Sequence, residues 1–294
     1  VVDVAKCHGC SKCVNVCPVE AMSLTSANDP HRLRKKKAKV DATLCLGCGV
    51  CVRTCDRDGI RLAARPERVI TPVDSAQRAV LMAIERGKQG WPLSLHGNGD
   101  AAIDSILDAV EAARDEGVDV QALRCRIEHC SILHDEQIAR MQALGMVPSF
   151  LINHVHYWGH VMRDEVFGPE KVQLLDRCRA VEEAGLNWVM HTDAPVSPLG
   201  ALHKIRVAVA RDMWAEPETI LAPQERVGVE AAVRAVTRNA AWACHSEHEI
   251  GSLEPGKLAD LVVLEDDPRK VEPTGISGIG ISETWMDGQK VYEA

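Results

Sequence analysis

Residues 91–100 read Trp-Pro-Leu-Ser-Leu-His-Gly-Asn-Gly-Asp, and this stretch sets the pattern of most of the chain. Trp91–Leu95 is a short apolar strand, His96–Asp100 is a loop that ends in a helix-capping aspartate, and Ala101–Arg114 is a helix. The same order recurs, with further strands at Cys125–Ile127, Met146–Ile152 and Trp188–Met190 and further helices at His134–Leu144 and Glu170–Ala184. This repetition predicts an α/β fold of the (β/α) barrel type.

Polar residues follow each of these strands. His96 follows the first strand, Glu128-His129 the second, and Asn153, His154 and His156 lie in a predicted loop after the third. The fourth strand leads into His191-Thr192-Asp193. Because (β/α) barrels keep their chemistry at the carboxyl ends of the strands, these residues are the candidate site.

Four motifs carry a family resemblance. They are His96-Gly-Asn-Gly-Asp100, Ile127-Glu-His129, His191-Thr-Asp-Ala-Pro195 and the run from Ile250 to Leu261, Ile-Gly-Ser-Leu-Glu-Pro-Gly-Lys-Leu-Ala-Asp-Leu. From residue 89 onward the chain resembles the amidohydrolase superfamily, in particular amidohydrolase family 3. The resemblance implies that residues 250–294 return to a small β-sandwich beside the barrel, with strands at Leu261–Leu264 and Thr284–Val291.

The resemblance also implies roles for single residues. His96 and His129 would be metal ligands on barrel strands five and six, and Asp193 on strand eight would be both ligand and general base. His154 would contact a small amide-type substrate. Zinc bound by imidazoles lowers the pKa of a bound water, and a nearby carboxylate takes its proton during hydrolysis of a C–N bond. Ordinary roles remain open: a turn cap for His96, a core position for His129 and a turn position for Asp193.

Half of the expected barrel has no counterpart. The His-x-His of the family's first strand and the bridging residue of its fourth strand are missing, and His154-x-His156 follows strand seven instead. Between residue 89 and the tail there are about 160 residues, against roughly 250 in a full barrel. We therefore expect a partial barrel of strands five to eight, with weak metal binding, little turnover and open edges through which the chain forms homo-oligomers.

A different pattern fills the amino-terminal part. Cys7, Cys10, Cys13 and Cys17-Pro18 have the spacing of cluster-binding bacterial ferredoxins, and Cys45, Cys48, Cys51 and Cys55 repeat it. The double match predicts a small α+β domain with two [4Fe–4S] clusters, whereas zinc or disulfides give no reason for the repeat. By resemblance to dicluster ferredoxins, one cluster takes Cys7, Cys10, Cys13 and Cys55, and the other takes Cys17, Cys45, Cys48 and Cys51. Asp56 stands where a proline is usual.

A basic run follows the first cysteine motif. Ser26–Pro30 is a turn between two expected strands, and beside it lie Arg32, Arg34, Lys35, Lys36, Lys37 and Lys39. Such a run is commonly a solvated hairpin face. Docking of an acidic redox partner is the functional alternative, and nucleic-acid binding is not expected.

Composition divides the chain at the same place. Residues 1–90 carry a net charge of +7 and residues 91–294 one of −15, and ten of the twelve histidines follow residue 90. We expect a ferredoxin domain at 1–70, a helical joint at 71–88 that begins at Thr71-Pro72-Val73-Asp74, a partial barrel at 89–249 and a β segment at 250–294. No apolar run is long enough for a membrane helix and no signal peptide opens the chain, so we expect a cytoplasmic protein.

Three functions fit these features. The first is a metal-dependent hydrolase of C–N bonds with a fused ferredoxin domain, its activity doubtful without the first half of the barrel. The second is an electron-transfer protein whose hydrolase part is not catalytic. The third is a fused or misassembled reading frame, which Val1 in the place of an initiating Met and the short barrel would fit.

Overall fold

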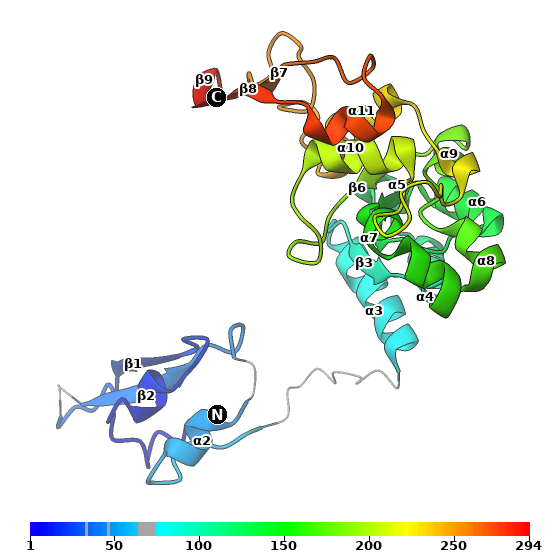
Figure 1. The fold of residues 1–294 in the computed structure, drawn as a ribbon. Coiled ribbons are helices and arrows are strands. Elements are labelled where there is room, and N and C mark those ends of the chain that lie inside the picture. Colours follow the sequence, from blue (N-terminus) through cyan, green and yellow to red (C-terminus); the bar gives the residue numbers. More distant parts are fainter. Residues whose placement is uncertain (33–34, 46–47, 64–73) are drawn as a thin grey trace. The chain divides into compact units, whose positions relative to one another are not determined.

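The computed structural model describes residues 1–32, 35–45, 48–63 and 74–294. The chain divides into two compact units, Val1–Thr71 and Pro72–Ala294 (Figure 1). Arg34 of the basic run and Thr71, Pro72 and Val73 of the predicted helix start lie outside the described residues. In the described ranges, no helix has the length and apolar character needed to cross a membrane.

The first unit is a hairpin with two short helices. Its elements are α1 Lys12–Asn15, β1 Met22–Ser26, β2 Lys36–Val40 and α2 Val50–Thr54. The two strands pair antiparallel from Met22↔Val40 to Ser26↔Lys36, as the turn at Ser26–Pro30 predicts. Met22, Ala38 and Ile60 form a small buried core together with Cys13. So small a core buries little apolar surface, and domains of this size usually need a metal or another crosslink to be stable.

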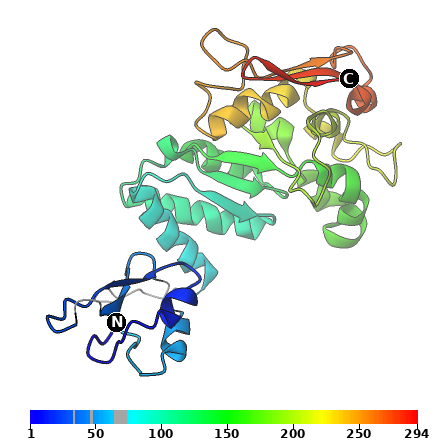
Figure 2. The ribbon, with the colours of Figure 1, turned by 90° about the vertical axis from the view of Figure 1, so that its left-hand side faces the viewer.

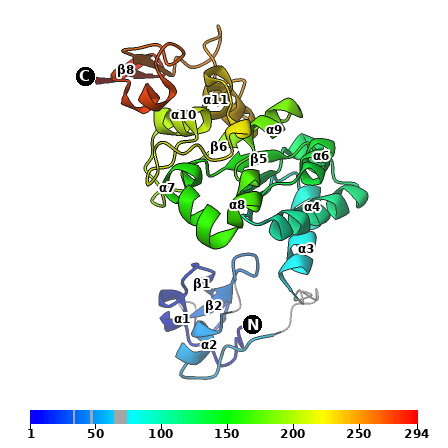
Figure 3. The same ribbon diagram turned by 45° about the vertical axis from the view of Figure 1, so that its right-hand side comes forward.

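The joint helix belongs to the second unit. It is α3, Ser75–Lys88, and the Asp74 carboxylate caps its amino terminus by accepting a hydrogen bond from the backbone N–H of Gln77 at 2.8 Å. It packs along α4, Asp100–Asp115 (Figure 3). Ala83 of α3 joins the main core together with apolar residues of α4 such as Ile103 and Leu107.

A parallel sheet of four strands organises this unit. The strands are β3 Ser94–Gly97, β4 Arg126–His129, β5 Val147–Phe150 and β6 Val189–Met190, in that spatial order. Helices α4, α5 Val120–Leu123 and α6 Asp135–Leu144 connect the first three strands. Gly97 is required where α4 meets β3, because a Cβ there would lie 2.8 Å from the side chain of Ile106. Each predicted strand and helix up to β5 is present, with ends shifted by a few residues; β3 begins three residues later than predicted.

The predicted loop after β5 is wrong. Residues 153–161 form helix α7, Asn153–Val161, which continues into the π-helical turn η1 Met162–Val166. Val155, His156 and Gly159 are buried on one side of α7. His156 occupies a buried position of α7 where an apolar residue would be expected, so the segment lacks the apolar periodicity from which a helix is predicted.

The predicted helix Glu170–Ala184 is also wrong, since it is broken into α8 Gly168–Lys171, η2 Val172–Leu174 and α9 Cys178–Glu183. The fully buried Arg211 guanidinium donates hydrogen bonds to the carbonyls of Leu175 and Asp176, at 2.8 and 3.0 Å. The N–H of Asp176 donates to the carbonyl of Ser131 at 2.9 Å. The backbone groups at the break are therefore bonded to other parts of the fold instead of to a helix.

The carboxyl-terminal part adds helices and a second sheet. It contains α10 Ala201–Ala210, η3 Pro223–Glu225, α11 Val229–Val236, α12 Arg238–Ala243, β7 Leu261–Leu264, η4 Pro273–Gly278, β8 Ile281–Met286 and β9 Gln289–Glu293. Strands β7, β8 and β9 form an antiparallel sheet, visible at the end of the unit in Figure 2. The strand predicted at Thr284–Val291 is in fact a hairpin, because Asp287 and Gly288 both have positive φ, the geometry of a tight two-residue turn.

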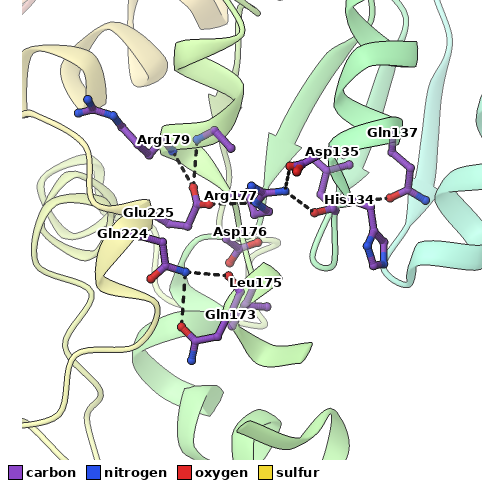
Figure 4. A network of polar contacts seen from close by, with 12 residues as sticks. His134, Asp135, Gln137, Gln173, Leu175, Asp176, Arg177, Arg179, Gln224 and Glu225 are labelled. Carbon is purple, nitrogen blue, oxygen red and sulfur yellow. Dashed lines mark hydrogen bonds and ion pairs between the residues drawn. The ribbon is translucent and has the colours of Figure 1, made fainter. Parts of the chain in front are cut away.

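A buried carboxylate fixes the broken helix segment (Figure 4). Glu225 accepts hydrogen bonds from the backbone N–H groups of Arg179 and Ala180, both at 3.1 Å, at the start of α9. Its other oxygen accepts from Nε of Arg177 at 2.9 Å, and Arg177 also donates to Asp135 at 2.5 Å. One carboxylate thus caps a helix and joins η3 to the start of α6 through a charged hydrogen bond.

Replacement of Glu225 by glutamine should destabilise the second unit by about 1.5–3 kcal/mol, because the charge-assisted bonds are lost while the site stays buried. Chemical denaturation of the full chain measures this change. Glu183→Gln is the matched control, since it removes the exposed ion pair to Arg179 on the same helix and should cost less than about 1 kcal/mol. Equal losses in the two variants would contradict the capping role of Glu225.

Asp176 should make stability depend on pH. Burial raises the pKa of Asp176 to about 8, against an opposing effect of Arg211. In the unfolded chain this carboxyl ionises near pH 4, so folding takes up a proton between these values. Stability therefore falls as pH rises toward 8. Relative to Asp176→Asn, the free energy of unfolding should decline from pH 5 to pH 8, with a slope of at most about 1.4 kcal/mol per pH unit. If the free energy of unfolding had the same pH dependence in the wild type and in Asp176→Asn, a raised pKa of Asp176 would be excluded.

Candidate functional site

Two of the predicted ligands lie against each other on adjacent strands. The imidazole rings of His96 on β3 and His129 on β4 are 4.4 Å apart between centroids and meet edge to face. In the parallel ladder Gly97 is the partner of His129, and His96 is the partner of Glu128. Regular pleating would place His96 and His129 on opposite faces. His129 instead has a φ of 78°, and this left-handed backbone ends the alternation where the two rings meet.

Left-handed backbone recurs at the ends of the strands. Besides His129, Cys130 has a φ of 48° and Asp193, beyond β6, has a φ of 49°. Residues with side chains adopt this conformation rarely and at a cost of about 1–3 kcal/mol each, and such residues gather at functional sites. The strained positions coincide here with two of the predicted ligands.

A third and a fourth imidazole lie close to His129. The His191 ring, which follows β6, is 4.9 Å from that of His129 between centroids. His154 at the start of α7 is close enough to both rings for them to affect its ionisation, and its own ring meets Trp158 edge to face. The sequence placed His191 in a motif but gave it no role. Its position directly after the last strand was the signal that could have identified it.

Burial keeps the imidazoles of His129, His154 and His191 neutral. It lowers the pKa of His154 to about 4, with His129 and His191 acting in the same direction. Burial also lowers the pKa of His129 and of His191, and the carboxylate of Asp193 opposes the shift in all three. Within the part of the chain that the structure describes, Nδ1 of His129, Nδ1 of His154 and Nε2 of His191 have no hydrogen-bond partner. Neutral imidazoles with unbonded ring nitrogens are the form that binds zinc.

The donor types therefore suit a divalent metal, but the arrangement is open. Among the residues with described positions, no three His, Cys, Asp or Glu side chains lie close enough together to hold one metal ion. His96 and Asp193 are exposed, whereas His129 is buried. A metal bound here would have to draw these side chains together, which costs part of the binding free energy.

His156 lies away from this cluster and has a structural contact. Its Nδ1 is 3.0 Å from the backbone carbonyl of Asp212 and 3.4 Å from the carboxylate of that residue, which also pairs with Arg206. His156 thereby joins α7 to the segment after α10. His154 lies near His129 and His191, whereas His156 contacts Asp212. The two histidines of His154-x-His156 therefore do not share a metal site.

In the first unit, two cavities gather the eight motif cysteines. The first is lined by Cys7, Cys10, Cys13 and Cys55, and the second by Cys17, Cys45, Cys48 and Cys51. Each cavity thus holds three cysteines of one run and the last cysteine of the other, because α1 packs against α2. In the described part of the chain, no two cysteines are joined by a disulfide.

Backbone donors complete the first cavity. The N–H of Ala38 donates to Sγ of Cys7 at 3.2 Å, and the N–H of Gly59 donates to Sγ of Cys55 at 3.3 Å. In a [4Fe–4S] cluster each thiolate binds its own iron, so the four sulfurs need not converge on one point as they must for a single ion. The residues of both cavities therefore fit a cluster.

Comparison with known proteins agrees with both parts. The family model described as "Amidohydrolase family" matches residues 56–292, and that described as "4Fe-4S dicluster domain" matches residues 6–58. The chain is 32% identical over 212 residues to "N-substituted formamide deformylase" of Arthrobacter pascens, and 29% identical over 207 residues to "Protein LONG AFTER FAR-RED 3" of Arabidopsis thaliana. These matches cover 72% and 70% of this chain but only 38% and 35% of the relatives.

A solved structure gives the same result. The crystal structure of an uncharacterized metal-dependent hydrolase from Pyrococcus furiosus matches with a TM-score of 0.56 and 28% identity, over 67% of this chain and 38% of that one. The chain spans well under half the length of each of these proteins. It belongs to the amidohydrolase family and carries, before that match, a 4Fe-4S dicluster domain.

Proposed function

We propose that the second unit is the strand-five to strand-eight part of an amidohydrolase barrel with a weakly held divalent metal, zinc first among candidates. The first unit binds two [4Fe–4S] clusters and transfers electrons. The observation that carries the hydrolytic part is the meeting of four imidazole rings at the carboxyl ends of parallel strands, where burial keeps His129, His154 and His191 neutral and the backbone is strained.

In this proposal His96, His129 and Asp193 are metal ligands, and His191 is a fourth donor. A bound metal would supply a water of lowered pKa for attack on a C–N bond. Asp193 would take the proton from that water, and His154 would lie against the substrate. A relative that acts on N-substituted formamides supports small amides as the substrate class.

The partial barrel is supported by the order of the strands and by the comparisons. Strands β3 and β6 are the two edges of the four-stranded sheet, and the family relatives are more than twice as long as the stretch they share with this chain. Residues 250–294 would form the sandwich segment, of which β7, β8 and β9 supply one sheet.

The first unit is proposed to serve a redox partner. Cys7, Cys10, Cys13 and Cys55 would hold one cluster, and Cys17, Cys45, Cys48 and Cys51 the other. On β2, Lys36, Lys37 and Lys39 follow one another along the hairpin. This cationic strand would attract an acidic partner and raise the rate of encounter at low salt.

An electron-transfer protein with a non-catalytic hydrolase remnant is the second candidate. The specific observation in its favour is that no three ligating side chains of the described chain are close enough for one metal ion. The cysteines of each cavity would each bind a separate iron of a cluster, so they need not lie within reach of a single ion.

Metal analysis and activity distinguish the two candidates. The reconstituted chain should contain about eight irons and should bind added zinc weakly, with slow hydrolysis of N-formyl or N-acyl amines. His129→Asn should weaken zinc binding by about tenfold or more, while His245→Asn, at an exposed histidine, should leave it unchanged. Zinc binding that is equal in both variants, together with no hydrolysis, would favour the electron-transfer function alone.

The open sheet edge should make the chain self-associate. Trp91, just before β3, is 63% exposed, and an unpaired edge strand pairs readily with another chain. Light scattering should give a mass above that of the monomer, and Trp91→Lys should lower it. Trp214→Lys, at a tryptophan that is also exposed but lies after α10, should leave the mass unchanged. A monodisperse wild-type monomer with a cooperative melt would contradict association through this edge.

A further inference from the structure

The two cysteine cavities differ in charge. The charged or titratable residues that line the first cavity, besides its cysteines, are Lys6, His8, Lys12 and Asp56. The described residues that line the second cavity carry no charge. Besides its cysteines, they include Val19, Met22, Val50 and Leu62. With histidine neutral, two lysines and one aspartate leave the first cavity with an excess positive charge. An anion added to the first cavity is therefore stabilised more than one added to the second.

Two thiols of the first cavity accept hydrogen bonds from backbone N–H groups. The N–H groups of Ala38 and Gly59 point at Cys7 and Cys55, two thiols of the first cavity, at 3.2 and 3.3 Å. Net charge around a cluster, hydrogen bonds to its sulfurs and its solvent exposure set its reduction potential. Donors and cations both favour the reduced state, because reduction adds one negative charge to the cluster.

We propose that the two cavities hold clusters of unequal reduction potential, the higher at Cys7, Cys10, Cys13 and Cys55. This rests on the proposed binding of two clusters. A single electron delivered by a low-potential one-electron donor then settles in the first cavity. If the electron enters at the cluster of the second cavity, it passes on to the cluster of the first. The second cluster is then oxidised from the 1+ to the 2+ state, and the first is reduced from 2+ to 1+. One electron moves, and no proton is required.

Lys12 and Asp56 allow a test by opposite charges. They form an ion pair at the first cavity, across the two cysteine motifs, and neither lines the second. Their side chains are 54% and 63% exposed, so solvent screens their effect and the shifts should be modest. Removal of the lysine charge should lower the potential of the nearby cluster, and removal of the aspartate charge should raise it.

The experiment is a redox titration of the reconstituted full chain, followed by electron paramagnetic resonance at low ionic strength. Iron and sulfide analysis comes first. We expect two separate one-electron steps. Lys12→Met should lower the higher midpoint potential, Asp56→Asn should raise it, and the lower one should stay unchanged in both. The ion pair of Lys35 and Asp29, which lines neither cavity, gives the controls Lys35→Met and Asp29→Asn, and these should move neither midpoint.

Three results would overturn the inference while cluster binding stands: about eight irons with coincident midpoints, a shift of the lower midpoint in place of the higher, or shifts of the same sign in both variants. The last would mean that the ion pair acts by holding the fold together. Far fewer than eight irons would instead refute the proposed cluster binding, and this inference with it.

Discussion

The parallel pairing of β3 with β4 is the interaction on which the candidate site depends. It aligns His96 with Glu128 and Gly97 with His129, and the left-handed turn of His129 then brings the two rings together. The third partner, His191, joins the same cluster only because β6 pairs with β5. Main-chain hydrogen bonds thus fix the positions of three side chains that lie up to 95 residues apart in the sequence.

A polar layer lies under these histidines. Glu128 on β4 accepts hydrogen bonds from Ser94 on β3 at 2.5 Å and from Arg126 at 2.9 Å, and Arg126 also donates to the carbonyl of Ala243 at 3.1 Å. Burial opposes ionisation of Glu128, but hydrogen bonds from Ser149, Ser94 and Arg126 lower its pKa overall. The layer therefore places an ion pair of Glu128 and Arg126 beside the cluster and joins α12 to the sheet. Its members alternate with apolar Leu95 and Ile127, which face the helices.

The sequence was sufficient for the order of the elements but not for every boundary or contact. The four strands were predictable because each is a short apolar run bounded by a polar loop and an amphipathic helix. Helix α7 was not, since its buried face contains His156, whose place in the core depends on the remote Asp212. The break before α9 depends on Arg211, more than thirty residues later. The ring contacts of His191 required the register of the sheet, which motif spacing does not contain. The grouping of the cysteines came instead from a family resemblance.

The two proposed sites of this chain obtain their metal affinity in opposite ways. In the first unit the cavities already gather four thiols each around very little apolar core, so bound clusters would supply much of the stability of that unit. In the second unit a large apolar core is complete without a metal, and the imidazoles stand at its edge with unbonded nitrogens. A metal there would contribute little to folding. The free energy gained from the metal–ligand bonds would have to exceed the free energy needed to move His96 and Asp193 inward. The thiol sites can thus be tightly occupied while the imidazole site stays weak, because only the former couple binding to the folding of their unit.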